Sequence, residues 1–522
     1  MPDRFTNAYL QDELNTFFDC PLPPDTLAGT VPADRPRREL SALLQREAAR
    51  LGAAEAVTGR AAQLAEDGSS AIVAGQQAGL LLGPSFTLSK SAGACRLAGR
   101  LNGEAAAGPA VPVFWLASQD HDAAEINHTY VLDLKEQLQR LDVDLPEGVP
   151  AGETPFRPEW LERIVTELGR GAWEPAHLED ISERLRGAAE RAATWADFFT
   201  AFYYAVLGSA APPILDPSVP EIADLFRSVL EHELEDPLAG PEAINEAGRQ
   251  LHRLGYAPQL GRGHQATNLF LTEHGDGNLP RRSLLRFDGR VFFTERERYS
   301  KADLLAILAG EPGRITPAAG LRPVAQDAVL PTAAFVVGPG ELRYLAQLRE
   351  IYRQHGVRQP VIWPRPHVTV LDPPVQRILD GFGLTAEQFL ADPDGHEQRK
   401  LLEISGADRI FREAEAELAE ARERMRRALT DFEPTLLCSV DRYVQRSAAG
   451  LDSLAAKTAQ AAGRRSETVT RQFARLRTQL LPGGGKQERM LSPVSHFLKF
   501  GVAPLLRLYL DVPESGTAWL RP

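Results

Sequence analysis

The sequence predicts an α/β protein with a parallel-sheet core, an inserted helical region and a C-terminal coiled coil. The core is indicated by short apolar runs that end at glycine, proline or a charged cluster and are separated by helical patterns. The coiled coil is indicated by a heptad seam that starts near residue 411. The chain has 522 residues, more than one continuous core usually holds, so we expect a large core domain with appendages.

The first half of the core follows a helical pattern in residues 39–48. An apolar strand is predicted at residues 71–74, then a glycine-rich loop, a helix at residues 88–101 and a second strand at residues 111–117. Two buried strands joined by a helix form a parallel βαβ unit, in which ligands bind at the carboxyl ends of the strands. Polar clusters follow both predicted strands, so we expect a ligand site there.

The middle of the chain predicts an insertion into this core. Helical patterns at residues 160–169, 180–203 and 222–235 are joined by turn-rich segments. Apolar strands then resume at residues 333–337 and 361–363, where they predict the second half of the core.

The last third of the chain predicts long helices. Apolar residues recur alternately three and four apart from Phe411 to Phe432, and a second seam continues after Pro434 as far as Leu480. This seam predicts a coiled coil between two chains or a helical hairpin within one. The predicted domains are residues 1–140 (helical lead-in and first half of the core), 141–285 (inserted connecting region), 286–395 (second half of the core), 396–482 (coiled coil) and 483–522 (C-terminal segment packing back on the core).

Charge and cysteine content exclude several functions. The chain has 58 basic and 70 acidic residues, a formal charge of −12, which is the wrong sign for coating nucleic acid or anionic lipid. Its three cysteines, Cys20, Cys95 and Cys438, lie far apart, so neither a disulfide framework nor a cysteine zinc site is indicated. No signal pattern and no run of about 18 apolar residues is present. We expect a soluble, cytoplasmic protein with no nucleic-acid or membrane partner.

The first candidate site is the glycine-rich loop after the first strand. Glycines at a strand-to-helix turn let backbone N–H groups face an anion, and the adjacent glutamines can bind hydroxyls or amides. A lysine in the first turn of the following helix could reach the same anion. No GK[ST] closes the loop, so it is not a Walker P-loop, and a tight structural turn remains an equal alternative. The residues are Gly75, Gln76, Gln77, Gly79, Gly83 and Lys90.

The second candidate site is the charged cluster Asp120, His121, Asp122 and Glu125. These side chains could act as acid or base, or hold an amine, and three carboxylates would raise the pKa of the imidazole. The alternative is helix capping by Asp120 or Asp122 with a solvated His121. A metal site is disfavoured because no second histidine stands at a ligand spacing.

Two later loops carry further candidates. Gly338, Gly340 and Glu341 follow one predicted core strand, and Arg365 ends the next. We expect them to contact ligand, with a solvated loop and a surface ion pair as the alternative. Residues 261–266 (GRGHQA) match a dinucleotide-binding fingerprint in letters, but a predicted strand follows instead of a helix, so we do not assign one.

Four segments together resemble the cysteine ligase family of bacillithiol biosynthesis. They are residues 73–84 (VAGQQAGLLLGP), 114–127 (FWLASQDHDAAEIN), 331–341 (PTAAFVVGPGE) and Pro364-Arg365. The resemblance implies a Rossmann-like core with inserted connecting domains, nucleotide binding, and a coiled coil that supports a homodimer. It also implies an activity, amide formation between L-cysteine and the amine of glucosaminyl malate, the last step of bacillithiol synthesis.

The resemblance places Gln76, Gln77, Asp120, His121 and Asp122 in the family's active-site pocket. A free carboxylate needs activation before it forms an amide, so we expect ATP or ADP as cofactor, with Mg²⁺ accompanying the nucleotide and no metal site of its own. The chain departs from adenylate-forming enzymes that look related to this family, because it has no HxGH signature. The expected roles are catalysis for Asp120, His121 and Asp122, substrate binding for Gln76, Gln77, Gly79, Glu125, Gly338, Gly340, Glu341 and Arg365, and nucleotide binding for Gly75, Gly83 and Lys90.

Two other functions remain compatible with the sequence. One is a nucleotidyl- or acyl-transferase acting on a different amine. The other is a non-catalytic assembly factor that binds a nucleotide and recruits a partner through the coiled coil. Polar clusters at two strand ends argue against a pure scaffold, which has no need of them.

Overall fold

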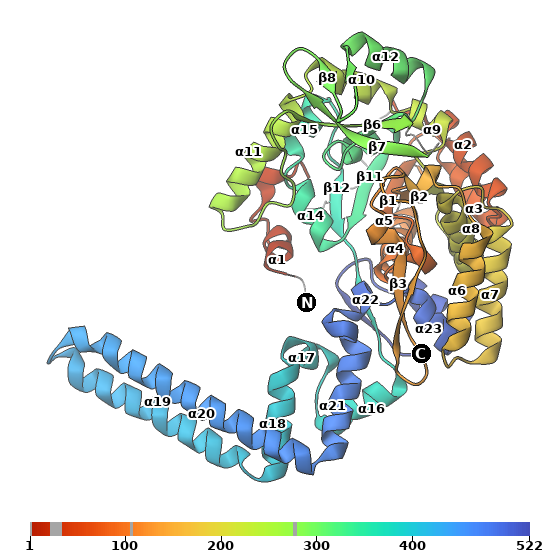
Figure 1. Cartoon of the computed structure of the whole chain (residues 1–522). Helices are drawn as coiled ribbons and strands as arrows, with labels where there is room; N and C mark the ends of the chain where they lie inside the picture. The colour runs from red at the N-terminus through yellow and green to blue at the C-terminus, as the bar shows by residue number, and fades with distance from the viewer. Residues whose placement is uncertain (1–2, 21–33, 105–107, 275–278) are drawn as a thin grey trace. The chain divides into compact units, whose positions relative to one another are not determined.

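The computed structural model describes residues 3–20, 34–104, 108–274 and 279–522, which form two compact units (Figure 1). Unit 1 comprises residues 1–370 and 488–522, and unit 2 comprises residues 371–487. In sequence, unit 2 is thus inserted between two parts of unit 1. It starts before the predicted boundary at 396, because the preceding helices pack on a later helix of the same unit.

A five-stranded parallel sheet forms the centre of unit 1, in the order β12-β11-β1-β2-β5. The apolar runs of the sequence supply its buried strands, and β1 lies between β2 and β11. Strand order reverses between β1 and β11, which is where ligands bind in open α/β sheets. The Rossmann-like fold class is confirmed. The strands are β1 (Ser70–Gln76), β2 (Ala110–Leu116), β5 (Ile214–Leu215), β11 (Thr332–Val337) and β12 (Val361–Pro364).

Helix α4 (Phe86–Gly103) follows β1 and packs on β1 and β2, as predicted for a βαβ unit. The turn before it has three successive residues with positive φ, Leu81, Leu82 and Gly83. Such backbone is costly for leucine and persists only when its surroundings hold it. Two side chains do so: Trp195 Nε1 donates to the Ala78 carbonyl and Ser492 Oγ to the Leu81 carbonyl, each at 2.7 Å.

Further helices of unit 1 surround the sheet (Figure 1). The single helix predicted at 180–203 is two helices, because the chain breaks before Thr194, whose side chain caps α8 by accepting from the Asp197 N–H. The helices are α1 (Arg4–Leu10), α2 (Arg37–Arg50), α3 (Glu55–Gln63), α5 (Ala123–Ile126), α6 (Pro158–Arg170), α7 (Pro175–Ala189), α8 (Trp195–Leu207), α9 (Pro220–Asp224), α10 (Arg227–Glu235), α11 (Ala239–Arg253), α12 (Lys301–Gly310), α13 (Arg322–Val329), α14 (Pro339–Leu345) and α15 (Arg349–Gln354).

An antiparallel sheet in the order β10-β6-β7-β8-β9 lies across the predicted boundary at residue 286. Successive strands pair with each other here instead of joining the parallel sheet, so the core resumes only at β11. A separate hairpin, β3 and β4, was also not predicted. These strands are β3 (His128–Leu132), β4 (Leu138–Asp142), β6 (Ala266–His274), β7 (Pro280–Phe287), β8 (Phe292–Phe293), β9 (Arg298–Tyr299) and β10 (Ile315–Pro317).

The C-terminal residues return to unit 1. Strand β14 (Thr517–Leu520) pairs in parallel with β13 (His367–Val370), although the whole of unit 2 separates them in sequence. Helix α24 (Val502–Leu510) packs on α4, and α23 (Pro493–Phe500) packs on α7.

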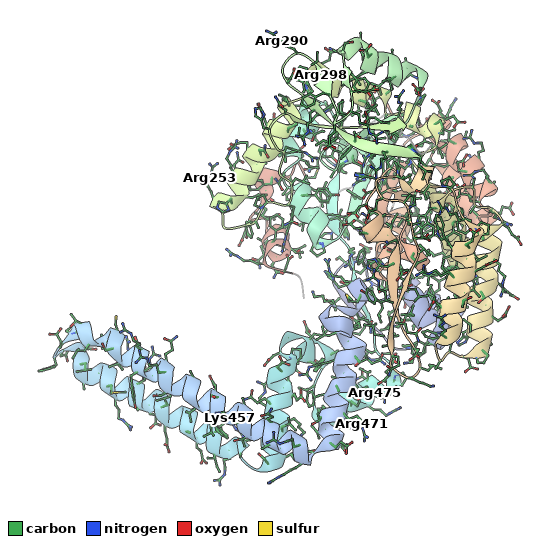
Figure 2. The ribbon with its side chains drawn as sticks, in the orientation of Figure 1. Arg253, Arg290, Arg298, Lys457, Arg471 and Arg475 are labelled. Atoms are coloured by element: carbon green, nitrogen blue, oxygen red, sulfur yellow. The ribbon has the colours of Figure 1, made fainter. Side chains whose placement is uncertain are left out.

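Unit 2 is helical, and its longest helices, α19 and α20, pair as a hairpin within the chain. The predicted helical coiled-coil region is confirmed. Its small core contains leucines and alanines of α18 and α20, and Phe382 stacks on Phe473 with ring centroids 4.7 Å apart. Lys457 is one of the charged side chains exposed on its outside (Figure 2). The helices are α16 (Pro373–Phe382), α17 (Ala386–Ala391), α18 (Pro393–Ser405), α19 (Asp408–Thr430), α20 (Leu437–Arg465) and α21 (Glu467–Leu480); α22 (Gln487–Met490) follows.

In the described part of the chain, no helix is both long enough and apolar enough to cross a membrane.

Candidate functional site

A cavity of about 590 Å³ lies in unit 1 at the carboxyl ends of β1, β2 and β11, where the strand order reverses. It has two walls. The strand-end wall includes Gly75, Gln76, Gln77, Lys90, Asp120, His121, Gly338, Gly340, Glu341 and Arg365. The outer wall comes from the antiparallel sheet, neighbouring loops and helices α13 and α14, and it includes Gln259, Leu260, Arg262, Phe270, Arg282, Pro317, Arg322 and Tyr344.

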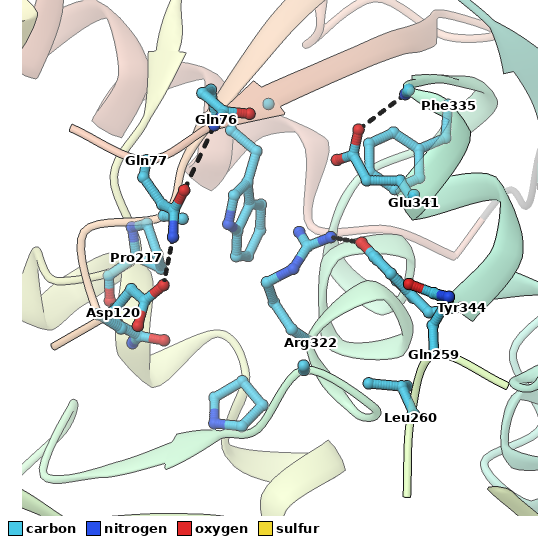
Figure 3. Close-up of a pocket in the computed structure, with 18 of the residues that line it drawn as sticks. Gln76, Gln77, Asp120, Pro217, Gln259, Leu260, Arg322, Phe335, Glu341 and Tyr344 are labelled. Carbon is cyan, nitrogen blue, oxygen red and sulfur yellow. Dashed lines mark hydrogen bonds between the residues drawn. The ribbon is translucent and has the colours of Figure 1, made fainter. Parts of the chain in front are cut away.

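A row of hydrogen bonds runs along the strand-end wall. Lys90 Nζ lies 2.6 Å from Glu341 Oε2 and donates to Gln76 Oε1 at 3.0 Å. Gln76 Nε2 donates to Gln77 Oε1 at 3.3 Å, and Gln77 Nε2 donates to Asp120 Oδ2 at 2.8 Å (Figure 3). The row joins the ends of three neighbouring strands, so it orients amide and carboxylate groups toward one cavity.

Lys90 lies deeper than the sequence suggested. Helix α4 begins at Phe86, and helical side chains point back toward the N-terminus, so the ammonium group reaches the end of β1 and donates to the Gly75 carbonyl at 2.7 Å. Burial lowers the pKa of Lys90, and the carboxylate of Glu341 opposes this effect. Glu341 also accepts from the Gly338 N–H at 2.8 Å. Lys90 and Glu341 therefore compensate each other's charge within the strand-end wall.

The charged cluster after β2 divides into two pairs. Asp120 and His121 line the cavity, whereas Asp122 and Glu125 are exposed and do not. Asp122 caps α5 by accepting from the Ala124 N–H at 3.1 Å, as the capping alternative predicted. Glu125 accepts a hydrogen bond from Gln77. Within this cluster, Asp120 and His121 are the groups that can meet a ligand.

The prediction that carboxylates raise the pKa of His121 is wrong. Burial and the nearby Arg282 lower that pKa, and they outweigh Asp120 and Asp122. Arg282 Nη1 lies 3.4 Å from His121 Nδ1, and a guanidinium can only donate, so Nδ1 accepts and the proton of the neutral ring is on Nε2. His121 is thus a neutral hydrogen-bond donor.

The outer wall contains arginines held by neutral groups. Arg282 donates to Thr316 Oγ1 at 2.9 Å and to the Pro317 carbonyl at 2.8 Å, and its guanidinium carbon lies 4.0 Å from the centre of the Phe270 ring. Burial lowers its pKa to about 10, which leaves it charged at neutral pH. Among the described residues, none of the carboxylates lies within ion-pair distance of this guanidinium.

Arg322 is held in a similar way. It donates to Gln326 Oε1 at 3.1 Å and to the Tyr344 hydroxyl at 3.2 Å, the latter visible in Figure 3. In the part of the chain that the structure covers, it too lacks a carboxylate partner. Cations held by neutral groups remain available to an anionic ligand. The sequence alone did not identify Arg262, Arg282, Arg322 or Tyr344 as site residues, because no local motif marks them; Arg262 belongs to the segment GRGHQA, which was not assigned a role.

Arg365 differs from these arginines because its charge is already paired. It lies in the cavity wall but is 2% exposed, and it binds both oxygens of Glu488 at 2.7 and 2.9 Å. Burial alone would raise the pKa of Glu488, yet hydrogen bonds from His367 and Arg365 hold it well below its usual range. The pair is buried, unlike the surface ion pair considered from the sequence.

The glycines of the first loop fall into two groups, one that lines the cavity and one that does not. Gly75 lines the cavity, and a Cβ there would lie 2.7 Å from the Trp115 carbonyl oxygen, so the close approach of β1 and β2 requires glycine. Gly79 and Gly83 lie outside the cavity lining and pack on each other, since a Cβ at Gly79 would lie only 2.8 Å from the Gly83 Cα. They form the tight structural turn that was the alternative. Gly338 and Gly340 line the cavity.

Within the described residues, no group of three or more histidine, cysteine, aspartate or glutamate side chains is arranged to hold a metal ion.

Comparison with known families gives two matches that together cover most of the chain. Residues 5–366 match the N-terminal Rossmann-like domain of the bacillithiol biosynthesis protein BshC, and residues 368–514 match its C-terminal coiled-coil domain. A Thermus thermophilus protein named "Putative cysteine ligase BshC" is 37% identical over 85% of this chain and 87% of its own length. Proteins with the same name from Heliobacterium modesticaldum (31% identical, 92% of this chain, 88% of the relative) and Staphylococcus epidermidis (28%, 84% and 81%) are also similar.

Proposed function

The chain belongs to the BshC family of bacillithiol biosynthesis, and from this premise we propose that it is a ligase that joins the carboxylate of L-cysteine to the amine of glucosaminyl malate. One observation carries the proposal: a single cavity has amide and carboxylate side chains on one wall and arginines held by neutral groups on the other. Glucosaminyl malate has complementary groups, with an amine and hydroxyls at its sugar end and two carboxylates at its malyl end.

The strand-end wall suits the sugar end. Gln76 and Gln77 offer donors and acceptors to hydroxyls, and Asp120 can bind an ammonium group. Gln77 Nε2 and the His121 backbone N–H both donate to Asp120, each at 2.8 Å, which fixes the carboxylate. Asp120 is therefore the residue we assign to hold the amine and to accept its proton when the nitrogen attacks the acyl carbon.

The outer wall suits anions. Arg282 and Arg322 can bind the malyl carboxylates or the phosphates of ATP, since planar guanidinium groups match both. ATP, with Mg²⁺ accompanying it, would supply activation of the cysteine carboxylate, so that one carboxylate oxygen leaves on AMP or phosphate as the amide bond forms. Neutral His121, with its proton on Nε2, would donate to the oxygen that becomes negative as the amide forms.

A homodimer, implied by the family resemblance, is part of the proposal. Large apolar side chains of the unit 2 hairpin are exposed, among them Ile410 (61%), Phe432 (81%) and Tyr443 (58%). Exposed apolar side chains that together form a contiguous patch mark protein interfaces. Light scattering of the wild type and of Phe432→Glu tests this: a dimer that becomes a monomer supports pairing through the hairpin.

The experiment that tests the function is thiol and metabolite profiling of a strain that lacks the gene, with and without the gene restored. We expect bacillithiol to disappear and glucosaminyl malate to accumulate, with both reversed on complementation. Unchanged bacillithiol would refute the proposal and would favour a transferase acting on another amine. The purified protein, supplied with L-cysteine, glucosaminyl malate and ATP, then shows whether nucleotide consumption accompanies amide formation.

A further inference from the structure

One arginine of the outer wall, Arg262, is held by a hydrogen-bonding arrangement of its own. Its backbone N–H donates to Asn245 Oδ1 at 2.9 Å, and its carbonyl accepts from Asn245 Nδ2 at 3.0 Å. Its Nε donates to Asn268 Oδ1 at 3.0 Å. Both the backbone and the side chain of Arg262 are thus fixed.

The loop before Arg262 is fixed as well. Gln347, which is fully buried, accepts from the Gln259 and Leu260 N–H groups at 2.8 and 2.9 Å and donates to the Leu260 and Ile244 carbonyls at 2.9 and 3.2 Å. Gln259, Leu260 and Arg262 all line the cavity. A loop with this many buried side-chain hydrogen bonds presents its residues in one geometry.

A buried carboxylate supports Asn268. Asn268 is fully buried, and its Nδ2 donates to Glu233 Oε1 at 3.0 Å, while His355 Nε2 lies 2.9 Å from Glu233 Oε2. The Asn268 amide is therefore oriented with its oxygen toward Arg262. Gly240 allows the close packing, because a Cβ there would lie 2.6 Å from Asn268 Nδ2.

The guanidinium group of Arg262 has hydrogen-bond donors that no described protein group accepts from. Of its three nitrogens only Nε has a hydrogen-bond partner among the described residues, and Nη2 is buried without one. A buried donor without a partner costs free energy. Nη1 has no partner either among the described residues and is not buried in the same way, so it is the nitrogen that a ligand in the cavity can meet. Burial also lowers the pKa of Arg262, with Glu233 opposing.

We propose that Arg262 forms an oxyanion-binding subsite of the cavity, and that Asn268, fixed by Glu233, is the positioning residue that aims it. The ligand chemistry is a carboxylate or a phosphate, since either accepts charge-assisted hydrogen bonds from a guanidinium group. The inference deepens the proposed function and rests on it for the ligand's identity: the group is a malyl carboxylate or a nucleotide phosphate. It is independent of Arg282 and Arg322, which have other partners.

Calorimetric titration of the full-length protein tests the subsite with three probes: glucosaminyl malate, ADP and inorganic phosphate. Arg262→Ala should weaken at least one probe about 10- to 100-fold, as expected for the loss of charge-assisted hydrogen bonds. Arg262→Lys should recover only part of the loss, because an ammonium group cannot bond Asn268 and a ligand with the same fork geometry. Arg290→Ala removes an equal charge from an exposed turn outside the cavity and should change no affinity (Figure 2).

The three probes distinguish the two possible sources of the bound oxyanion, which are the malyl carboxylate and the nucleotide phosphate. A loss confined to glucosaminyl malate identifies the carboxylate, and a loss for ADP or phosphate identifies the nucleotide. Wild-type affinities in Arg262→Ala, or no binding of any probe by the wild type, would overturn the subsite. The proposed function fails separately, when the wild type binds an oxyanion yet the strain without the gene still makes bacillithiol.

A double-mutant cycle tests the positioning role. Asn268→Leu should weaken the same probe in the wild-type background and have no further effect in Arg262→Ala, because its influence acts through Arg262. A merely structural role would weaken binding equally in both backgrounds and would overturn the assignment. Asn268→Ser serves in the cycle where Asn268→Leu does not fold.

Discussion

The two walls of the cavity differ in whether their cationic side chains are paired with carboxylates. In the strand-end wall, Lys90 is paired with Glu341 and Arg365 with Glu488. In the outer wall, Arg282 and Arg322 are held by hydroxyl, amide and carbonyl groups. A buried charge with a partner keeps the fold intact, whereas a cation held by neutral groups retains its attraction for an incoming anion. Proximity to the cavity therefore does not by itself identify a ligand contact.

The largest effect is expected at Asp120, the acid of the strand-end wall that is held by an amide and a backbone N–H. Asp120→Asn keeps the shape but cannot accept a proton, so kcat for amide formation should fall about 10²- to 10⁴-fold. Asp122→Asn is the matched control in the same cluster, and its rate should stay within about twofold because asparagine also caps helices. Equal losses in the two variants would contradict the division of this cluster.

The next effect concerns stability and tests whether Arg365 is structural. Glu488→Gln leaves a buried guanidinium without its counter-charge, which should lower the free energy of unfolding by about 3–5 kcal/mol. Urea denaturation measures this, with Glu246→Gln on the exposed surface as a control. The pKa of Glu488 is lowered in the fold, so its stabilising contribution is present above the unfolded value, about 4.3, and is lost as the pH falls from there through the lower folded value. If Glu488→Gln weakened substrate binding and left the stability unchanged, Arg365 would be a ligand contact like the arginines of the outer wall.

Arg322 should show the opposite behaviour. Arg322→Gln removes a cation that is held by neutral groups, so KM for the anionic substrate should rise about 10- to 100-fold while the melting temperature changes little. Steady-state kinetics and thermal unfolding of the same preparations measure both. A large loss of stability without a change in KM would show that Arg322 belongs to the packing of the wall.

The smallest expected effect is on the pKa of His121, a residue of the strand-end wall that lies beside Arg282 of the outer wall. Burial and Arg282 lower the pKa of His121, so the ring stays neutral to a lower pH than usual. Arg282→Gln removes the nearby positive charge, and the pKa should rise, so that protonation begins at higher pH as the solution is acidified. An NMR titration of the His121 ring measures this directly. An unchanged or lower pKa in the variant would show that burial alone sets its value.

The parallel sheet and the strand-end wall were the predictable parts. Apolar runs followed by glycine or polar residues are a local signal, and they indicated β1, β2, β11 and β12 together with Gln76, Asp120 and His121 at their ends. The outer wall has no such signal. Arg282 becomes a neighbour of the site only because an antiparallel sheet folds over it, and that sheet was divided by the predicted boundary at 286. Arg322 begins helix α13, and no local motif marks it as a site residue.

Charge pairing was equally unpredictable from local sequence. Nothing near Arg365 indicates that its carboxylate partner is Glu488, because the pairing depends on the return of the chain after unit 2. The lowered pKa of His121 depends on Arg282, which is also distant in sequence. Residue types at strand ends could thus be identified, but their protonation and availability required the tertiary structure.

The pairing of β13 with β14 has a consequence for how the protein is made. During translation β13 emerges before the helices of unit 2 and β14 after them, so β13 waits for its partner while the intervening residues are synthesised. Helical hairpins form quickly from local contacts, and a folded hairpin makes the loop between the two strands effectively shorter. Because the hairpin folds quickly, the synthesis of the residues up to β14 sets how long an unpaired strand is exposed to other chains on the same message.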